Sequence, residues 1–483
     1  MNRPNILWIC TDQQRFDTLG CYGNPFVATP NIDRLARNGV LFEQAYCQSP
    51  VCTPSRASFL TGRYPRTTRC RQNGQNIPED EVLVTRLLAD AGYICGLAGK
   101  LHLSACMPKA APGMERRIND GYAEFHWSHH PMPDWPTNEY IHWLRERGQT
   151  FAPQPFEGSK YVRVGPKAEH HQTTWCAEKA IQFIRASRER PKFKRPWLFS
   201  VNMFDPHHPF DPPESHLRRY LDKLEQIPLP NYTPGELDGK TFFQKTDHEG
   251  AYGNPDLFPF SQMNERDHRL LTAAYWAMVD LIDEQVGRII AALEETGQLE
   301  ETIIIFMSDH GELLGDHGMY LKGPHFYDPC VHVPLIISHP KLIKGGRRIG
   351  NLVELTDLAP TLLEAAGLPV YEGMQGRSLW PVLTDSAADY EYRSSVYCEH
   401  YNASSKQRGK GGFATMVRTE RYKIVVYHRE NEGELYHLRN DPKETHNLWN
   451  DEAHRDVKLD MYRLLCDRMA ETVDPLPLRQ SGW

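Results

Sequence analysis

The residues with the clearest chemical potential lie in the segment PVCTPSRASFLTGRYP, residues 50–65. It contains Cys52, followed at short spacing by Pro54 and Arg56 and then by Leu-Thr-Gly-Arg at positions 60–63. Considered alone, Cys52 would be interpreted as a small, partly buried thiol, which is the usual state of a free cysteine. The defined neighbours on its C-terminal side favour a chemical role instead.

Two apolar runs end in groups that bind metal ions. The run Asn5–Cys10 leads to Asp12, and the run Thr302–Met307 leads to Asp309 and His310. A lone Asp12 would more often be a turn or helix cap, but open parallel sheets collect ligands at the carboxyl ends of their strands. Because carboxylate and imidazole groups bind divalent cations, the pattern predicts one metal site beside residue 52.

The segment from residue 52 to residue 63 resembles the signature of the type I sulfatases, which are members of the alkaline phosphatase superfamily. In that family a maturation enzyme oxidises the cysteine to formylglycine, and the hydrate of this aldehyde is the nucleophile. The resemblance implies formylglycine at position 52, one divalent metal, commonly Ca²⁺, and a formylglycine-generating enzyme as a partner. The implied metal ligands are Asp12, Gln13, Cys52, Asp309 and His310.

Gln13 departs from the family pattern, which often has two adjacent aspartates after the first strand. An amide oxygen can bind a hard cation but adds no negative charge, so Mn²⁺ and Mg²⁺ remain alternatives to Ca²⁺. The same Asp-Gln and Asp-His pairs fit phosphonate monoester and phosphodiester hydrolases of the superfamily, which share the formylglycine. Such a hydrolase is therefore the main alternative function.

Three further segments resemble sulfatase motifs that supply charges and proton carriers. They are GKLH at 99–102, PHHP at 206–209, and the lysine that follows SDHGELLGDHG, residues 308–318. Considered singly, their lysines would be solvated surface groups and their histidines core residues. The resemblance implies instead a catalytic set made of Cys52, Arg56, Lys100, His102, His207 and Lys322.

The resemblance also implies a division of labour among these groups. Cations surround the tetrahedral anion, and Asp309 takes the proton of the nucleophile. His207 or Lys322 protonates the leaving oxygen, with His208 as the neighbouring alternative to His207. His102 then assists the release of sulfate, so that covalent catalysis divides one difficult step into two.

Alternation of helices and strands predicts an α/β fold with a doubly wound sheet flanked by helices over residues 1–375. The resemblance implies that this sheet is alkaline-phosphatase-like. For residues 376–483 the pattern predicts a smaller α+β domain with a short antiparallel sheet. Residues 433–448 resemble the closing segment of sulfatase chains. The stretches 108–165 and 212–263 lack periodicity and are predicted to be irregular. The longer helices are predicted at 82–92, 175–190, 265–296, 356–366 and 452–472.

The irregular stretch at 108–165 is rich in histidine and tryptophan and is a candidate wall of the substrate pocket. Aromatic faces and arginine forks suit an anionic sulfated sugar. Ordinary packing of the loops explains the same aromatic residues equally well. The candidates are His126, Trp127, His129, His130 and Trp135, together with Arg69, Arg71, Gln72 and Asn73.

Charge and composition argue against some classes of binding partner. The net charge is −7 with no cationic run, which argues against nucleic acid. No secretory segment and no apolar run of about 18 residues is present, so we expect a cytoplasmic protein without a membrane partner, although a processed exported form would have the same sequence. The 11 cysteines show no paired spacing, which is typical of free thiols.

The sequence therefore predicts a sulfuric ester hydrolase that releases sulfate from a small-molecule or oligosaccharide sulfate ester. Besides the phosphonate monoester or phosphodiester hydrolase, a non-catalytic metal- or glycan-binding relative is a third hypothesis, and it predicts an unconverted Cys52. The oligomeric state, the natural ester and the sulfated position have no signal in the sequence.

Overall fold

The computed structural model describes residues 3–133, 135–189, 195–386, 390–402 and 412–481. Within these ranges nine strands form one mixed sheet in the order β11-β2-β10-β8-β1-β7-β3-β4, and the short β9 pairs with β2. The strands are β1 Asn5–Thr11, β2 Gly39–Tyr46, β3 Ile94–Gly99, β4 Tyr122–Trp127, β7 Trp197–Asn202, β8 Thr302–Ser308, β9 His332–Val333, β10 Leu335–Ser338 and β11 Arg347–Glu354.

Strand direction places most carboxyl ends at one edge of this sheet. β8, β7, β3 and β4 run parallel to β1, whereas β10 is antiparallel to both β8 and β2. β1 and β8 are buried along their whole length, as is typical of strands covered on both faces. The chain segments that follow the parallel strands therefore meet above the same edge.

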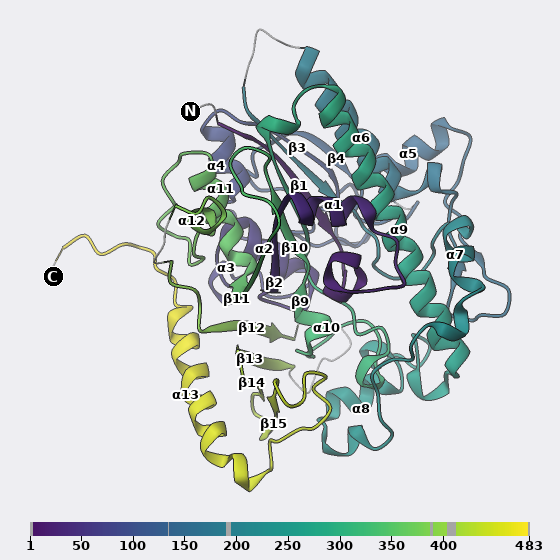
Figure 1. Cartoon of the computed structure of the whole chain (residues 1–483), viewed down its shortest axis with the longest axis vertical. Helices are drawn as coiled ribbons and strands as arrows, with labels where there is room; N and C mark the ends of the chain where they lie inside the picture. Colours follow the sequence, from purple (N-terminus) through teal and green to yellow (C-terminus); the bar gives the residue numbers. More distant parts are fainter. Residues whose placement is uncertain (1–2, 134, 190–194, 387–389, 403–411, 482–483) are drawn as a thin grey trace.

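Helices cover both faces of the large sheet (Figure 1). Successive side chains of a strand point to opposite faces, so β1 contributes Leu7 and Ile9 to one core and Ile6 and Trp8 to the other. The first core includes α1, α6 and α9, and the second includes α2, α4 and α11. Their bounds are α1 Pro30–Asn38, α6 Gln172–Glu189, α9 Glu265–Glu295, α2 Cys52–Thr61, α4 Val84–Asp90 and α11 Leu358–Ala365.

The two stretches predicted to be irregular contain regular elements. The first holds β4 and α5 (Glu139–Glu146), and the second holds α7 (Glu214–Leu221) and α8 (Phe242–His248). Each of these helices spans only about two turns, which is too short for a clear helical period. The predicted last residue of α6, Arg190, lies outside the described residues.

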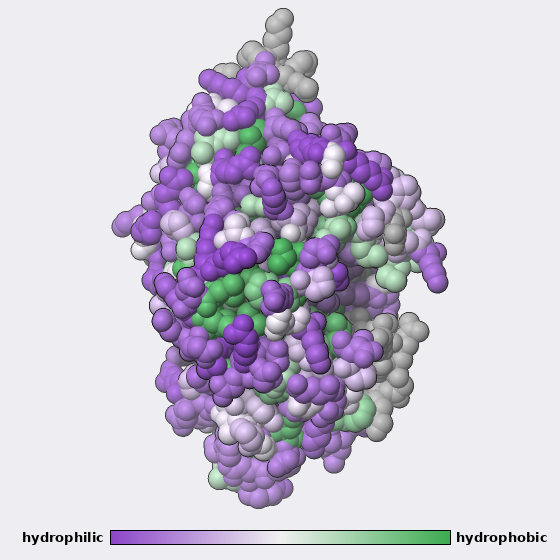
Figure 2. All heavy atoms as spheres, turned by 90° about the vertical axis from the view of Figure 1, so that its right-hand side faces the viewer, coloured by the Kyte–Doolittle hydropathy of each residue, from purple (hydrophilic) through white to green (hydrophobic). Residues whose placement is uncertain are grey.

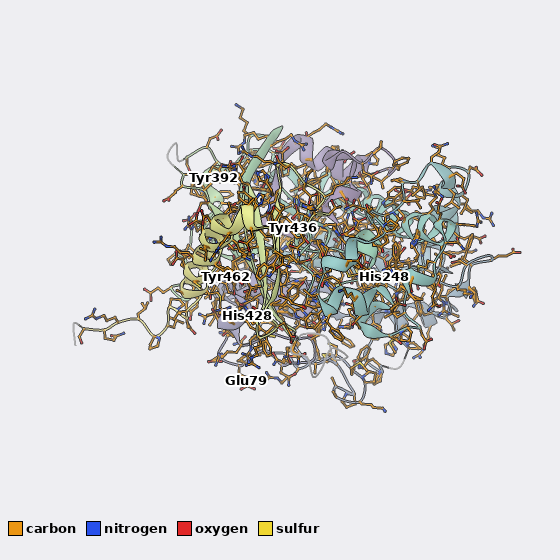
Figure 3. The ribbon with its side chains drawn as sticks, turned by 90° about the horizontal axis from the view of Figure 1, so that it is seen from below. Glu79, His248, Tyr392, His428, Tyr436 and Tyr462 are labelled. Carbon is orange, nitrogen blue, oxygen red and sulfur yellow. The ribbon has the colours of Figure 1, made fainter. Side chains whose placement is uncertain are left out.

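The C-terminal part forms a second, four-stranded antiparallel sheet, as predicted. Helix α13 (Arg455–Glu471) packs on it, with Met461 and Leu465 against Ile424 and Leu435. Figure 3 shows α13, which carries Tyr462, beside the strands of this sheet, which carry Tyr436. The strands are β12 Ser395–Tyr401, β13 Phe413–Thr419, β14 Tyr422–Tyr427 and β15 Glu432–His437, and β15 had not been predicted as a strand.

A buried ion network joins the two sheets. Glu354, the last residue of β11, accepts hydrogen bonds from Arg468 of α13 at 2.8 Å and from the Tyr64 hydroxyl at 2.5 Å. Arg393 lies 3.5 Å from the same carboxylate. The domain boundary at 375/376 remains a prediction.

Several shorter elements lie between the longer ones along the chain. They are α3 Pro65–Thr68, α10 Asp328–Val331, α12 Trp380–Leu383 and the strand pair β5 Gln154–Pro155 and β6 Arg163–Val164. On the side that carries α7 the surface is mainly hydrophilic, with an apolar area near its middle (Figure 2). Among the described residues, no helix is both long and apolar enough to cross a bilayer.

Candidate active site

The ends of the parallel strands deliver the chemical groups. Asp12 follows β1, Lys100 follows β3, and Asp309 follows β8. Cys52 is the first residue of α2, a helix that is buried over all ten residues. Residue 52 therefore lies where the helix dipole favours negative charge.

Cys52 is the meeting point of these groups. Its Sγ lies 3.1 Å from His310 Nε2 and 3.7 Å from Asp12 Oδ1. Lys322 Nζ approaches the same sulfur to 3.3 Å and Lys100 Nζ to 3.7 Å. Burial and Asp12 raise the pKa of the Cys52 thiol, but the two ammonium groups outweigh them and the pKa is lowered.

The structure brings together a ligand set suited to a divalent cation. Ligand atoms of Asp12, Cys52, Asp309 and His310 all lie within 4.8 Å of one another, and all four residues are buried. His310 Nδ1 lies 2.9 Å from the Gly311 carbonyl, to which it donates, so that Nε2 faces the cluster with a free lone pair. Two carboxylates and one imidazole fit such an ion.

Gln13 is held beside this cluster in a left-handed backbone conformation, with φ of 64°. Its side-chain oxygen accepts a hydrogen bond from Lys322 Nζ, and its side-chain amide donates to Glu312. Glu312 is fully buried, and it also accepts from the backbone N–H of Leu314 at 2.9 Å. In this arrangement the Gln13 oxygen contacts a lysine.

Arg56 contacts the carboxylates. Its Nε donates to Asp309 Oδ2 at 2.8 Å, its Nη2 lies 3.2 Å from Asp12 Oδ2, and its Nη1 donates to the Lys100 carbonyl at 2.7 Å. The residue is 1% exposed and does not line the cavity. A guanidinium that bridges two carboxylates fixes their spacing.

Charge compensation keeps Asp12 ionised. Burial alone would raise its pKa, but Lys100, with Nζ 2.5 Å from Oδ2, holds it well below the usual range with the help of Arg56 and Lys322. Burial conversely lowers the pKa of Lys100, and Asp12 more than restores it. Both groups are therefore charged at neutral pH.

The cavity above Cys52 has a volume of about 850 Å³. His102, His207 and His208 line it, and burial lowers the pKa of all three, so they are neutral near pH 7. His207 Nδ1 lies 2.5 Å from the His208 carbonyl. Since both residues of the pair face the cavity, the choice between His207 and His208 stays open.

Four of the nine predicted pocket residues line this cavity, namely Gln72, Asn73, His129 and His130. The other five do not, so that part of the prediction was wrong. Trp127 and Trp135 are 1% exposed and pack against each other, His126 contacts Glu139, Arg69 forms ion pairs with Asp80 and Glu81, and Arg71 is exposed to solvent.

No sequence motif had indicated Glu115, which organises the loop after β3. This buried carboxylate accepts the backbone N–H of His102 at 2.9 Å and of Leu103 at 2.8 Å, and the indole N–H of Trp127 at 2.9 Å. Glu115 belongs to no motif named above, and Glu312 lies within SDHGELLGDHG at a position to which no role had been assigned. Their contacts depend on the arrangement of distant loops.

The fold and this site define a class of protein, the hydrolases with an alkaline-phosphatase-like fold. The profile of the sulfatase family matches residues 4–368, so the chain belongs to the sulfatase family and is a hydrolase of sulfuric esters. The profile described as "N-sulphoglucosamine sulphohydrolase, C-terminal" matches residues 315–471.

Relatives of this family are similar in sequence to nearly the whole chain. An arylsulfatase of Clostridium perfringens is 30% identical over 472 residues, which cover 94% of this chain and 92% of the relative. An N-acetylglucosamine-6-O-sulfatase of Bacteroides thetaiotaomicron is 25% identical over 525 residues, covering 98% and 88%. The solved phosphonate monoester hydrolase from Silicibacter pomeroyi has a TM-score of 0.83 at 25% identity, covering 98% of this chain and 96% of that chain.

Proposed function

We propose that the chain releases sulfate from sulfate monoesters with a formylglycine made from Cys52 and with one bound divalent cation. The observation that supports this most directly is the convergence of Lys100 and Lys322 on the residue-52 sulfur at the floor of the cavity. Two ammonium groups beside a nucleophile position suit a sulfate, which is anionic in the ester and in the product.

Asp12, Asp309, His310 and residue 52 would hold the cation, with Gln13 as the further predicted ligand. On metal binding, the side-chain oxygen of Gln13 would exchange its contact with Lys322 for a contact with the ion. When bound, the ion supplies Lewis-acid stabilisation of negative oxygen. Carboxylate oxygens favour Ca²⁺, while the single imidazole leaves Mn²⁺ and Mg²⁺ open.

Formylglycine supplies a hydroxyl that attacks sulfur and a second hydroxyl that lets the sulfated residue collapse back to the aldehyde. In our proposal Asp309 accepts the proton of the attacking hydroxyl, while Arg56 holds the orientation of this carboxylate. His207 or Lys322 provides the proton that the leaving oxygen takes up. His102, neutral near pH 7 because burial lowers its pKa, accepts the second proton.

The cavity lining indicates the kind of alcohol that is released. Of the described lining residues, none is acidic, and Lys100 and Lys322 are the cations. Amide groups share the remaining wall with apolar side chains, which fits the hydroxyls and the apolar face of a sugar or the ring of an aryl ester. These groups are Gln72, Asn73, Gln75 and Asn254 with Met107, Met132, Phe151 and Leu257.

Co-expression with a formylglycine-generating enzyme tests the proposal. Mass analysis of the tryptic peptide that contains residue 52 should show conversion of the thiol to the aldehyde. The matured protein should release sulfate from an aryl sulfate, and Cys52→Ala should abolish turnover. An unaltered thiol in active protein, or retained turnover in Cys52→Ala, would reject the formylglycine mechanism.

Hydrolysis of phosphonate monoesters is the second candidate, and two observations favour it. Gln13 stands where many sulfatases have an aspartate, and the fold superposes on a phosphonate monoester hydrolase with a TM-score of 0.83. Comparing kcat/KM for an aryl sulfate and an aryl phosphonate monoester decides which of the two activities is the main one. Sulfated mono- and disaccharides assayed in parallel identify the preferred alcohol.

A further inference from the structure

A second cluster of metal-binding groups lies in the cavity wall. It consists of His102 in the loop after β3, Cys106 further along that loop, and His129 in the segment after β4. Their candidate ligand atoms all lie within 4.8 Å of one another. The side chains line the cavity, yet the residues are only 6%, 7% and 8% exposed.

Two nitrogen atoms of this cluster lack hydrogen-bond partners. Among the described residues, His102 Nδ1 and His129 Nε2 are both buried without one. The other nitrogen of His129 faces His130 Nδ1 at 2.5 Å, so a protonated Nδ1 leaves Nε2 with a free lone pair. Buried polar atoms are nearly always satisfied, and a bound ion would satisfy these two.

One carboxylate joins the loop of His102 to the segment that precedes His129. Glu115 accepts the backbone N–H of His102 and the indole N–H of Trp127, two residues before His129. The two imidazole rings meet edge to face, with centroids 4.4 Å apart. Cys106 packs with Trp127 in a small apolar cluster. The three ligands are therefore preorganised by contacts independent of any metal.

We propose that His102, Cys106 and His129 form a second metal site that takes Zn²⁺ or another thiophilic divalent cation. Two imidazoles and one thiolate are the ligand types that Zn²⁺ prefers, whereas the carboxylates beside residue 52 suit harder ions. The cavity leaves the fourth position of a tetrahedral ion open. Binding exchanges the Cys106 thiol proton for the metal and releases the proton to solvent.

A filled site would inhibit the enzyme, and this consequence rests on the proposed function. His102 is the group that we propose as the acceptor of the second proton, and a metal on its Nδ1 would withdraw electron density from the ring. The ion would also narrow the cavity beside residue 52. Zinc would therefore act as an inhibitor that competes with the sulfate ester.

Cobalt spectroscopy tests metal binding without reference to activity. Co²⁺ added to the wild-type protein with Ca²⁺ in excess should give a thiolate-to-cobalt charge-transfer band and the visible bands of a tetrahedral site. Cys106→Ser and His129→Ala should lose them, while Cys466→Ser, a matched control at an exposed cysteine, should keep them. Native mass spectrometry with Zn²⁺ should show one zinc fewer in the two cluster variants.

Cys52→Ala distinguishes the two clusters, because residue 52 is the only other sulfur ligand among the metal-binding groups of the described residues. The bands should persist in this variant. Their loss in Cys52→Ala, or their persistence in Cys106→Ser, would overturn the site. Since neither readout requires turnover, these results are independent of the proposed sulfatase mechanism.

Inhibition is measured separately on matured enzyme. The zinc concentration that halves the rate should rise at least about tenfold in Cys106→Ser and His129→Ala, each variant being compared with its own zinc-free rate. Cys466→Ser should respond as the wild type does. Equal zinc sensitivity of all the proteins would overturn the inhibitory role and place the zinc at the residue-52 cluster.

Discussion

Replacing Lys322 with methionine removes a charge from the centre of the proposed site while keeping an apolar chain of similar length. Lys322 Nζ lies 3.3 Å from Cys52 Sγ, and this sulfur stands in for the formylglycine oxygen that would attack sulfate. Two unit charges at that distance interact by about 5 kcal/mol at an effective dielectric constant of about 20. Part of this energy is already present in the ground state, because the substrate is an anion.

The expected decrease in kcat depends on the part of this interaction energy that is gained only in the transition state. Removal of one preorganised donor from a developing anion costs about 3–4 kcal/mol, so kcat of Lys322→Met should fall by about 10²–10³. If Lys322 rather than His207 serves the leaving oxygen, the loss should be greater for an aryl sulfate with a poor leaving group. Comparing 4-nitrophenyl sulfate with phenyl sulfate measures this difference.

Two control measurements distinguish a loss of electrostatic stabilisation in Lys322→Met from a loss of protein stability. Gln13 loses a hydrogen-bond donor, so the free energy of unfolding of the variant must be determined alongside its kinetics. Lys341→Met is the matched control, because Lys341 is an exposed lysine whose partner is the surface residue Glu300 at 2.7 Å. A folded Lys322→Met enzyme with kcat within about threefold of the wild type would refute the electrostatic role.

Three further predictions concern pH, metal and packing. Burial lowers the pKa of His400 to about 4, so the unfolded chain binds a proton at this residue more readily than the folded chain does. The free energy of unfolding should therefore fall as the pH drops below about 6.5, by about 2 kcal/mol between pH 7 and pH 5. Urea unfolding of His400→Gln should not show this pH-dependent loss. Exhaustive chelation should lower turnover by about 10²-fold or more, and added Ca²⁺ should restore it; activity that survives chelation contradicts the metal site. Glu354→Gln removes the carboxylate that Arg393 and Arg468 share, although Asp357 and Glu471 remain as their other partners. It should lower the free energy of unfolding by about 2 kcal/mol, whereas unchanged urea unfolding would contradict the role of this network.

Much of the site was predictable because its groups follow recognisable strands. The runs that became β1 and β8 are apolar throughout, since both faces of these strands are covered by helices. Once parallel strands are inferred, Asp12 and Asp309 must emerge at the same edge of the sheet.

The pocket was predicted less well, because residue type does not reveal the direction of a side chain. Trp127 and Trp135 were attractive as binding surfaces, but their rings pack together in the loop, with centroids 5.3 Å apart. Arg69 was a candidate for an anionic substrate, but Asp80 and Glu81 already occupy its guanidinium. Local sequence cannot distinguish a charge that faces a cavity from one that is already paired.

By itself, the sequence determined the family, singled out Cys52 as the residue that we propose is modified, and indicated the strand ends that approach it, because these depend on short motifs and on the period of apolar residues. Only the tertiary structure showed that Arg56 bridges the two carboxylates, that Gln13 lies between Lys322 and Glu312, and that Glu115 ties the His102 loop to Trp127. The physical reason is distance along the chain: Gln13 and Glu312 are 299 positions apart, and such contacts exist only after the sheet has brought the loops together.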